Sequence, residues 1–211
     1  MCTRYYIDNY REDFRELFEE VKRSALTECF LTKAARPIVY SGEVRPTDIV
    51  PVIAPDHRGN RAVFPMKWGF TMPGSKQPLV NARVETAATK PTFKESWLRH
   101  RCIIPASWYY EWEHYKTVDG KTRTGDKYLI QPKDSSVTWL GGLYRIEDDL
   151  PVFTVLTKAP SEELSRIHDR MPLILPEDLI NDWIDPSSKP DELIASALND
   201  MMIEKADKTD P

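Results

Sequence analysis

The chain has 211 residues, enough for one domain with a sizeable core, and its apolar fraction of 41% excludes a disordered protein. It lacks both an apolar run of the ~20 residues that a membrane span needs and the apolar stretch of a signal peptide, so a cytoplasmic protein is expected. The net charge of −4 is uneven: residues 177–211 hold ten acidic side chains against three lysines, which leaves the rest slightly positive and a nucleic-acid partner open.

The first half of the chain predicts two helices with short extended segments between them. Apolar side chains recur at helical spacing through residues 9–34, with charged residues between them, which predicts a helix. Between residues 37 and 70, apolar stretches broken by prolines are typical of short strands. A second helix is expected over residues 92–100.

The second half predicts antiparallel strands followed by short helices. Apolar and polar residues alternate through much of residues 101–158, which favours strands. Ser161 opens a weak helix-capping pattern, and amphipathic helices are expected over 176–185 and 190–202. We therefore expect an α+β protein with an antiparallel sheet and an acidic helical segment over about 177–211.

The cysteines and histidines predict neither a disulfide framework nor a metal site. Cys2, Cys29 and Cys102 are an odd and sparse set, which fits a reducing compartment. The four histidines are scattered, and no metal-binding motif such as CxxC or HExxH occurs. No metal and no cofactor are expected.

Cys2 is the first candidate for covalent chemistry. Removal of Met1 leaves an N-terminal cysteine whose α-amine has an ordinary pKa of roughly 7.7–8.0 and whose thiol titrates near ~8.5. An aldehyde that meets this pair forms an imine, which the sulfur closes to a five-membered thiazolidine; effective molarities for such ring closures reach ~10⁵ M. A cysteine at position 2 is usually incidental, so this chemistry needs support from other residues.

Three further segments carry polar side chains in unusual settings. Asn81 opens Asn-Ala-Arg-Val-Glu-Thr, Glu111 lies inside an aromatic run that raises a carboxyl pKa, and His168 precedes a proline among charged neighbours. Each also has a structural explanation: a turn for Asn81, an ion pair for Glu111, and a satisfied core position for His168. Residues 83–101 hold five basic side chains against two acidic ones, which suits a phosphate backbone or a solvated helix face.

Together and in this order, the motifs resemble those of the SRAP family, the SOS response-associated peptidase-like proteins. The matching segments are Met1-Cys2-Thr3-Arg4-Tyr5, Lys67-Trp68-Gly69-Phe70, residues 81–86, Arg101 to Trp112, Gly142-Leu143-Tyr144 and residues 167–172. The resemblance covers Met1 to about Pro176. It implies one domain over residues 1–211 with a largely antiparallel, barrel-like β core and peripheral helices.

The resemblance also implies a function. A family member of this kind crosslinks to abasic sites in single-stranded DNA, including single-strand/double-strand junctions, and shields the lesion. Cys2 would supply the amine and thiol, and Asn81 would orient this residue or the linked sugar. Glu111 would move protons during imine formation and ring closure, and His168 would hold the sugar oxygen and assist reversal. A monomer is expected, associated with the nucleoid if the source is bacterial.

A second set of positions would contact DNA. The two arginines of this set would clamp phosphates beside the lesion, a hydroxyl would lie near the same phosphates, two aromatic rings would form an apolar platform for bases, and a proline would line the groove. These residues are Arg4, Arg83, Thr157, Trp68, Phe93 and Pro46.

Two departures from the family pattern bear on these expectations. Thr3 stands where the family usually has glycine, so strain or a narrower cleft is expected if that glycine has a positive φ or allows close approach of DNA. Lys158-Ala159-Pro160 replaces the common Thr-Glu-Ala-Asn, which puts the phosphate contacts there in doubt.

Two other functions stay open at this point. The first is a thiol peptidase or autoprotease that uses Cys2 with His168 and Glu111, with removal of Met1 as its minimal form. The second is a non-catalytic module that binds single strands through basic and aromatic side chains, with an affinity that depends on salt but not on the lesion.

Overall fold

The computed structural model describes residues 2–10, 12–34 and 36–206. Its centre is a closed barrel of five strands in which β10 runs parallel to β4 and the other neighbouring strands are antiparallel. The expected α+β domain with a barrel-like, largely antiparallel core is thereby confirmed. The barrel strands are β3 (Ile49–Pro55), β4 (Arg61–Trp68), β6 (Arg101–Ala106), β9 (Thr138–Glu147) and β10 (Leu150–Lys158).

Two glycines of the family motifs are explained by the packing of this barrel. A Cβ on Gly142 would lie 2.5 Å from Ile104 Cδ1 and 2.9 Å from the Thr154 carbonyl oxygen. Gly69 has a φ of +116°, and a Cβ there would lie 2.6 Å from Pro78 Cβ. Both positions therefore exclude a side chain, Gly69 by its backbone conformation as well.

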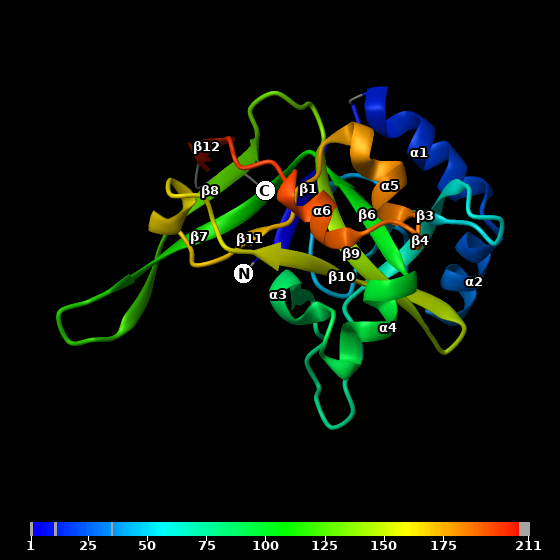
Figure 1. Cartoon of the computed structure of the whole chain (residues 1–211), viewed down its shortest axis with the longest axis horizontal. Helices are drawn as coiled ribbons and strands as arrows, with labels where there is room; N and C mark the ends of the chain where they lie inside the picture. The colour runs from blue at the N-terminus through cyan, green and yellow to red at the C-terminus, as the bar shows by residue number, and fades with distance from the viewer. Residues whose placement is uncertain (1, 11, 35, 207–211) are drawn as a thin grey trace.

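A second, fully antiparallel sheet lies beside the barrel in the order β12-β8-β7-β1-β2. In Figure 1, β7 and β8 form a long hairpin that reaches beyond the rest of the molecule. Strand β1 lies between β7 and the edge strand β2, and pairs with both. The strands are β1 (Arg4–Ile7), β2 (Gly42–Val44), β7 (Trp108–Lys116), β8 (Thr122–Pro132) and β12 (Met201–Lys205).

The predicted helix over residues 9–34 is in fact two helices, α1 (Glu12–Arg23) and α2 (Ala25–Lys33). Ser24 separates them because its backbone is extended, with ψ of 131°, and its hydroxyl accepts the Leu26 amide to cap α2. Both helices pack against β4. The helix expected over residues 92–100 is α4 (Pro91–Arg99), preceded by α3 (Val84–Ala87).

The expectation of a helical segment over residues 177–211 is only partly correct. A 3-10 turn, η2 (Glu177–Leu179), leads into α5 (Ile180–Ile184), and α6 (Pro190–Ala195) follows. The predicted helix over 190–202 is wrong at its end because Met201 and Met202 pair with β8 as part of β12. Residues 207–211 lie outside the described part of the chain. No helix of the described residues is long and apolar enough to cross a membrane.

Candidate functional site

The four residues expected to react come from different elements that converge where the two sheets meet. Cys2 precedes β1, and Glu111 lies in β7, the neighbour of β1. Asn81 begins β5 (Asn81–Arg83), which pairs with β10 of the barrel. His168 lies between η1 (Leu164–Arg166) and β11 (Met171–Pro172), and β11 pairs with the other edge of β10.

Two contacts, one to the Cys2 carbonyl and one to its thiol, fix the position of Cys2. Asn81 Nδ2 donates a hydrogen bond of 2.8 Å to the Cys2 carbonyl, and the Cys2 thiol lies 3.7 Å from the Arg4 carbonyl oxygen. Cys2 is fully buried. Burial, followed by the negative charge of Glu111, raises the pKa of its thiol well above the ordinary value expected from the sequence. While Cys2 is buried in this way, its thiol is therefore protonated at neutral pH.

Glu111 is a buried carboxyl with a perturbed pKa. Its residue is 4% exposed, and the Trp112 amide donates to Oε1 at 3.4 Å. Burial raises the pKa of Glu111 above its ordinary value. The aromatic run predicted a shift in this direction, and a buried carboxyl with a raised pKa is a candidate for proton transfer.

The contacts and burial of the His168 ring favour its neutral form. Its Nδ1 accepts a hydrogen bond of 3.0 Å from the Arg170 amide and also lies 2.8 Å from Asp169 Oδ1. The second contact is an ion pair only if the ring is protonated, whereas burial lowers the pKa of His168. We therefore assign the neutral ring, with its hydrogen on Nε2. The ring also contacts that of His114 edge to face, with centroids 5.3 Å apart.

An open groove of about 470 Å³ reaches Glu111 and His168, whereas Cys2 and Asn81 are not among its lining residues. Its lining residues are Thr3, Arg4, Glu111, Trp112, His114, Thr124 and His168. Thr3 lines the groove. It is not among the described non-glycine residues with a positive φ, so the strain that a positive φ would cause is absent at this position. The sequence analysis missed Trp112 and His114, although Trp112 belongs to the motif that contains Glu111.

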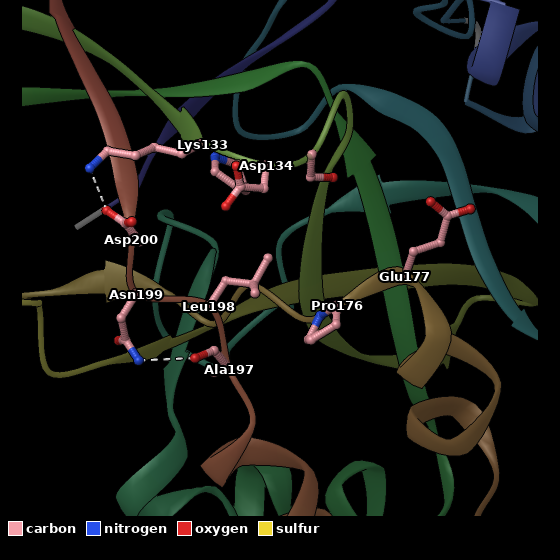
Figure 2. A pocket seen from close by; sticks show the side chains of 10 residues that line it. Lys133, Asp134, Pro176, Glu177, Ala197, Leu198, Asn199 and Asp200 are labelled. Atoms are coloured by element: carbon pink, nitrogen blue, oxygen red, sulfur yellow. Dashed lines mark hydrogen bonds and ion pairs between the residues drawn. The ribbon is translucent and has the colours of Figure 1, made fainter.

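A separate pocket of about 400 Å³ lies between β8, β12 and η2. Figure 2 shows the Lys133–Asp200 ion pair and the hydrogen bond from Asn199 to the Ala197 carbonyl at its wall. None of the residues expected to react lines this pocket. It is therefore distinct from the groove that Glu111 and His168 line.

The structure keeps both expected phosphate-binding arginines near the site. Arg4 lines the groove, where its guanidinium pairs with Glu43 and lies 5.6 Å from the centre of the Trp112 ring. Arg83 is exposed at the end of β5, two residues after Asn81. Pro46 lies half-buried in the turn that follows β2, outside the residues that line the groove.

Thr157 does not fit the predicted contact with DNA. Its side chain is fully buried, and its hydroxyl donates to the Ala82 carbonyl at 3.3 Å, which ties β10 to β5. Its carbonyl instead accepts a bond of 2.6 Å from Arg170, whose guanidinium also forms two 2.8 Å bonds with Glu85. Sequence analysis missed Arg170, although it lies in the motif around His168.

Trp68 and Phe93 do not form the predicted platform for bases in this structure. The Trp68 ring has no exposed surface; it stacks on Phe153 and donates from Nε1 to the Val80 carbonyl at 2.9 Å. Phe93 is 5% exposed and packs against Phe70. These aromatic side chains therefore belong to the core. The sequence could not show this, because the motif reads the same whether its rings are buried or exposed.

Arg101 corrects the expectation of a basic surface over residues 83–101. This guanidinium is buried and donates to the carbonyls of Trp97 and Trp183 at 2.9 and 2.8 Å. It therefore joins α4 and α5 to the barrel and is not available to a phosphate. Among the residues that the structure describes, no group of three or more His, Cys, Asp or Glu side chains could hold a metal ion.

The chain belongs to the SRAP family: the family described as SOS response associated peptidase matches residues 1–208. It is 30% identical over 208 residues to the abasic site processing protein YoaM of Bacillus subtilis, covering 94% of this chain and 85% of that protein. It is 29% identical over 194 residues to the abasic site processing protein YedK of Escherichia coli, covering 87% and 79% of the two chains.

Solved structures share the fold. A protein from Bacteroides thetaiotaomicron superposes with a TM-score of 0.71 at 20% identity, over 98% of this chain and 93% of the other. A protein from Bordetella bronchiseptica gives a TM-score of 0.69 at 21% identity, over 98% and 100% of the two chains.

Proposed function

We propose that this protein binds abasic sites in single-stranded DNA and captures them covalently through Cys2 after removal of Met1. The observation that carries the proposal is the hydrogen bond from Asn81 to the Cys2 carbonyl beside the buried carboxyl of Glu111. It fixes residue 2 next to a group that can move protons. The names of the SRAP relatives, abasic site processing proteins, support the same substrate.

The first step is imine formation. The Cys2 amine, which exists only after Met1 has left, attacks the aldehyde carbon of the ring-opened sugar and forms a carbinolamine. Glu111 takes a proton from the nitrogen and returns one to the carbinolamine hydroxyl, which leaves as water. The raised pKa of Glu111 suits both halves of this exchange, since it makes the carboxylate a stronger base and keeps the acid form available at higher pH than in an ordinary carboxyl.

The second step closes the ring. The Cys2 sulfur adds to the imine carbon, its proton passes to the nitrogen, and a thiazolidine results without loss of a further group. The net change is one aldehyde and one aminothiol joined with loss of one water. Because sulfur and nitrogen belong to the same residue, closure is intramolecular, and the product resists the hydrolysis that reverses a simple imine.

His168 would act on the sugar oxygen. In the neutral form assigned above, its Nε2–H can donate to the hydroxyl released when the sugar ring opens, which favours the aldehyde form. The groove brings this ring, Glu111 and Arg4 to one surface. Arg4 and Arg83 would bind the phosphates that flank the lesion.

Cys2→Ala is the variant that tests this chemistry. It keeps an N-terminal amine but lacks sulfur, so it should form only an imine. Wild-type protein incubated with an abasic single-stranded oligonucleotide should give an adduct that survives heating in denaturant. The variant should give such an adduct only after borohydride reduction.

Cys29→Ala is the matched control, since Cys29 lies half-buried in α2, away from the groove. It should crosslink as the wild type does. A heat-stable, unreduced adduct of equal yield from Cys2→Ala would overturn the proposal. Repeated turnover of a peptide substrate without DNA would instead favour the thiol peptidase, which stays a prediction.

A further inference from the structure

Glu43 is surrounded by three cations on one face of the five-stranded sheet. It pairs with Arg4 Nη1, with Arg45 Nε at 2.7 Å and with Lys127 Nζ at 3.5 Å. Its side chain is only 8% exposed. Burial opposes ionisation, but the hydrogen bonds and charges of Arg45 and Arg4 outweigh it and hold the pKa of Glu43 below its ordinary value. One negative charge therefore faces three positive ones.

The three cations remain open to solvent to different degrees. The side chains of Arg45, Arg4 and Lys127 are 61%, 37% and 19% exposed. A guanidinium offers five N–H donors, and Glu43 occupies only one on each arginine in the bonds above. The cluster thus keeps a net positive charge and donors that can reach an anion from outside.

Aromatic rings alternate with these cations. Lys127 Nζ lies 3.7 Å from the centre of the Tyr110 ring and 5.9 Å from that of Trp112. Arg4 also lies over Trp112. Further along the sheet, the rings of Tyr6 and Trp108 stack at 4.6 Å.

The strand register places Arg4, Glu43, Lys127 and the aromatic rings on the same face, and Arg45, which follows β2, joins them through its bond to Glu43. Arg4 is opposite Tyr110, and Trp112 is opposite Lys127. Tyr6 is opposite both Glu43 and Trp108. Directly opposed residues, and residues two apart in one strand, point to the same side of a sheet. Arg4 and Trp112 also line the groove that Glu111 and His168 line, so the cluster adjoins that groove.

We propose that the cluster of Arg4, Arg45 and Lys127 around Glu43 is a phosphate-binding site for the DNA single strand on one side of the lesion. The inference rests on the proposed function and adds Arg45 and Lys127 to the residues that hold DNA. Glu43 keeps the three cations together while leaving them net positive. Trp112 and the Tyr6–Trp108 pair supply rings beside which bases can stack without sequence readout.

The test measures binding without crosslinking. The probe is a single-stranded oligonucleotide with a tetrahydrofuran abasic analogue, which has no aldehyde, and fluorescence anisotropy gives its affinity for the full-length protein over a range of salt concentrations. Each phosphate contact contributes about −0.7 to the slope of log K against log salt for single strands. Arg45→Gln and Lys127→Gln should each make the slope shallower by about that amount.

Lys22→Gln is the matched control. Like Lys127, Lys22 pairs with a carboxylate, Glu19, and lies over an aromatic ring, that of Tyr40 at 5.8 Å, but it belongs to α1. Its loss should leave the slope unchanged. A slope for Lys127→Gln and Arg45→Gln equal to that of Lys22→Gln would overturn the inference, and a lower melting temperature with an unchanged slope would show that the cluster only joins strands.

The two proposals fail in distinguishable ways. A wild-type protein that forms no adduct with aldehyde-bearing DNA would contradict covalent capture, whatever the salt slopes are. A wild-type protein that crosslinks fully, with variants that bind with the wild-type slope, would contradict only the phosphate site.

Discussion

Removal of Met1 would change the chemistry of Cys2, because an amide nitrogen would become an amine beside a thiol. While the thiol is buried as described, its pKa is raised and it stays protonated. Asn81 donates a hydrogen bond to the carbonyl of this residue, a contact that does not involve the nitrogen of Cys2. The sequence indicated the reactive groups, but the hydrogen bond joins residues 79 apart and could not be predicted from either motif alone.

Glu111 yields a pH-dependent prediction. A carboxyl whose pKa is higher in the folded than in the unfolded chain stabilises the folded state while it is protonated. That contribution is complete below the unfolded pKa of about 4.3 and is lost as pH rises through the raised folded pKa. Glu111→Gln, which stays neutral, should therefore be more stable than the wild type at pH 7 and equally stable at low pH.

Urea unfolding of both proteins at the two pH values measures this difference. Glu113→Gln is the control, since Glu113 lies in the same strand but is only half-buried. The same Glu111→Gln variant should crosslink about 10²–10⁴ times more slowly, the usual loss when a general acid–base is removed. If Glu111→Gln were less stable than the wild type at pH 7, this would contradict the conclusion that burial of the charged Glu111 carboxylate costs stability.

At the scale of elements, the sequence predicted strands better than the places where helices end. Residues 101–158 form β6 to β10, as their alternation indicated. The break between α1 and α2 was missed because apolar spacing continues on both sides of Ser24, whose backbone conformation the spacing does not report. Strand β12 was missed because Met201–Lys205 follows a helical pattern and is paired only by the distant β8.

The barrel gives a prediction about Gly142. Its position in β9 faces Ile104 and the Thr154 backbone so closely that Gly142→Ala should cost about 1–3 kcal/mol in the free energy of unfolding. Gly141→Ala should cost less, because the added methyl meets only the Leu173 side chain, which can rotate. Urea unfolding of the two variants compares them directly, and equal stabilities would contradict the packing of the barrel described here.

At the scale of the whole molecule, the candidate site is formed by residues from both sheets and lies where the two sheets meet. The five-stranded sheet supplies Cys2 and Glu111, the barrel supplies Asn81 through β5 and β10, and the segment before β11 supplies His168. The family motifs predicted these four residues but not which aromatic side chains face solvent. Trp68 and Phe93 turned inward, while Trp112 lines the groove.

The most direct test of covalent capture is the intact mass of the protein before and after incubation with an abasic oligonucleotide. The purified protein should have the mass of the chain without Met1. After incubation, its mass should rise by that of one oligonucleotide less one water, without any reducing agent. A protein that has lost Met1 but keeps its mass in the presence of excess abasic DNA would contradict the account.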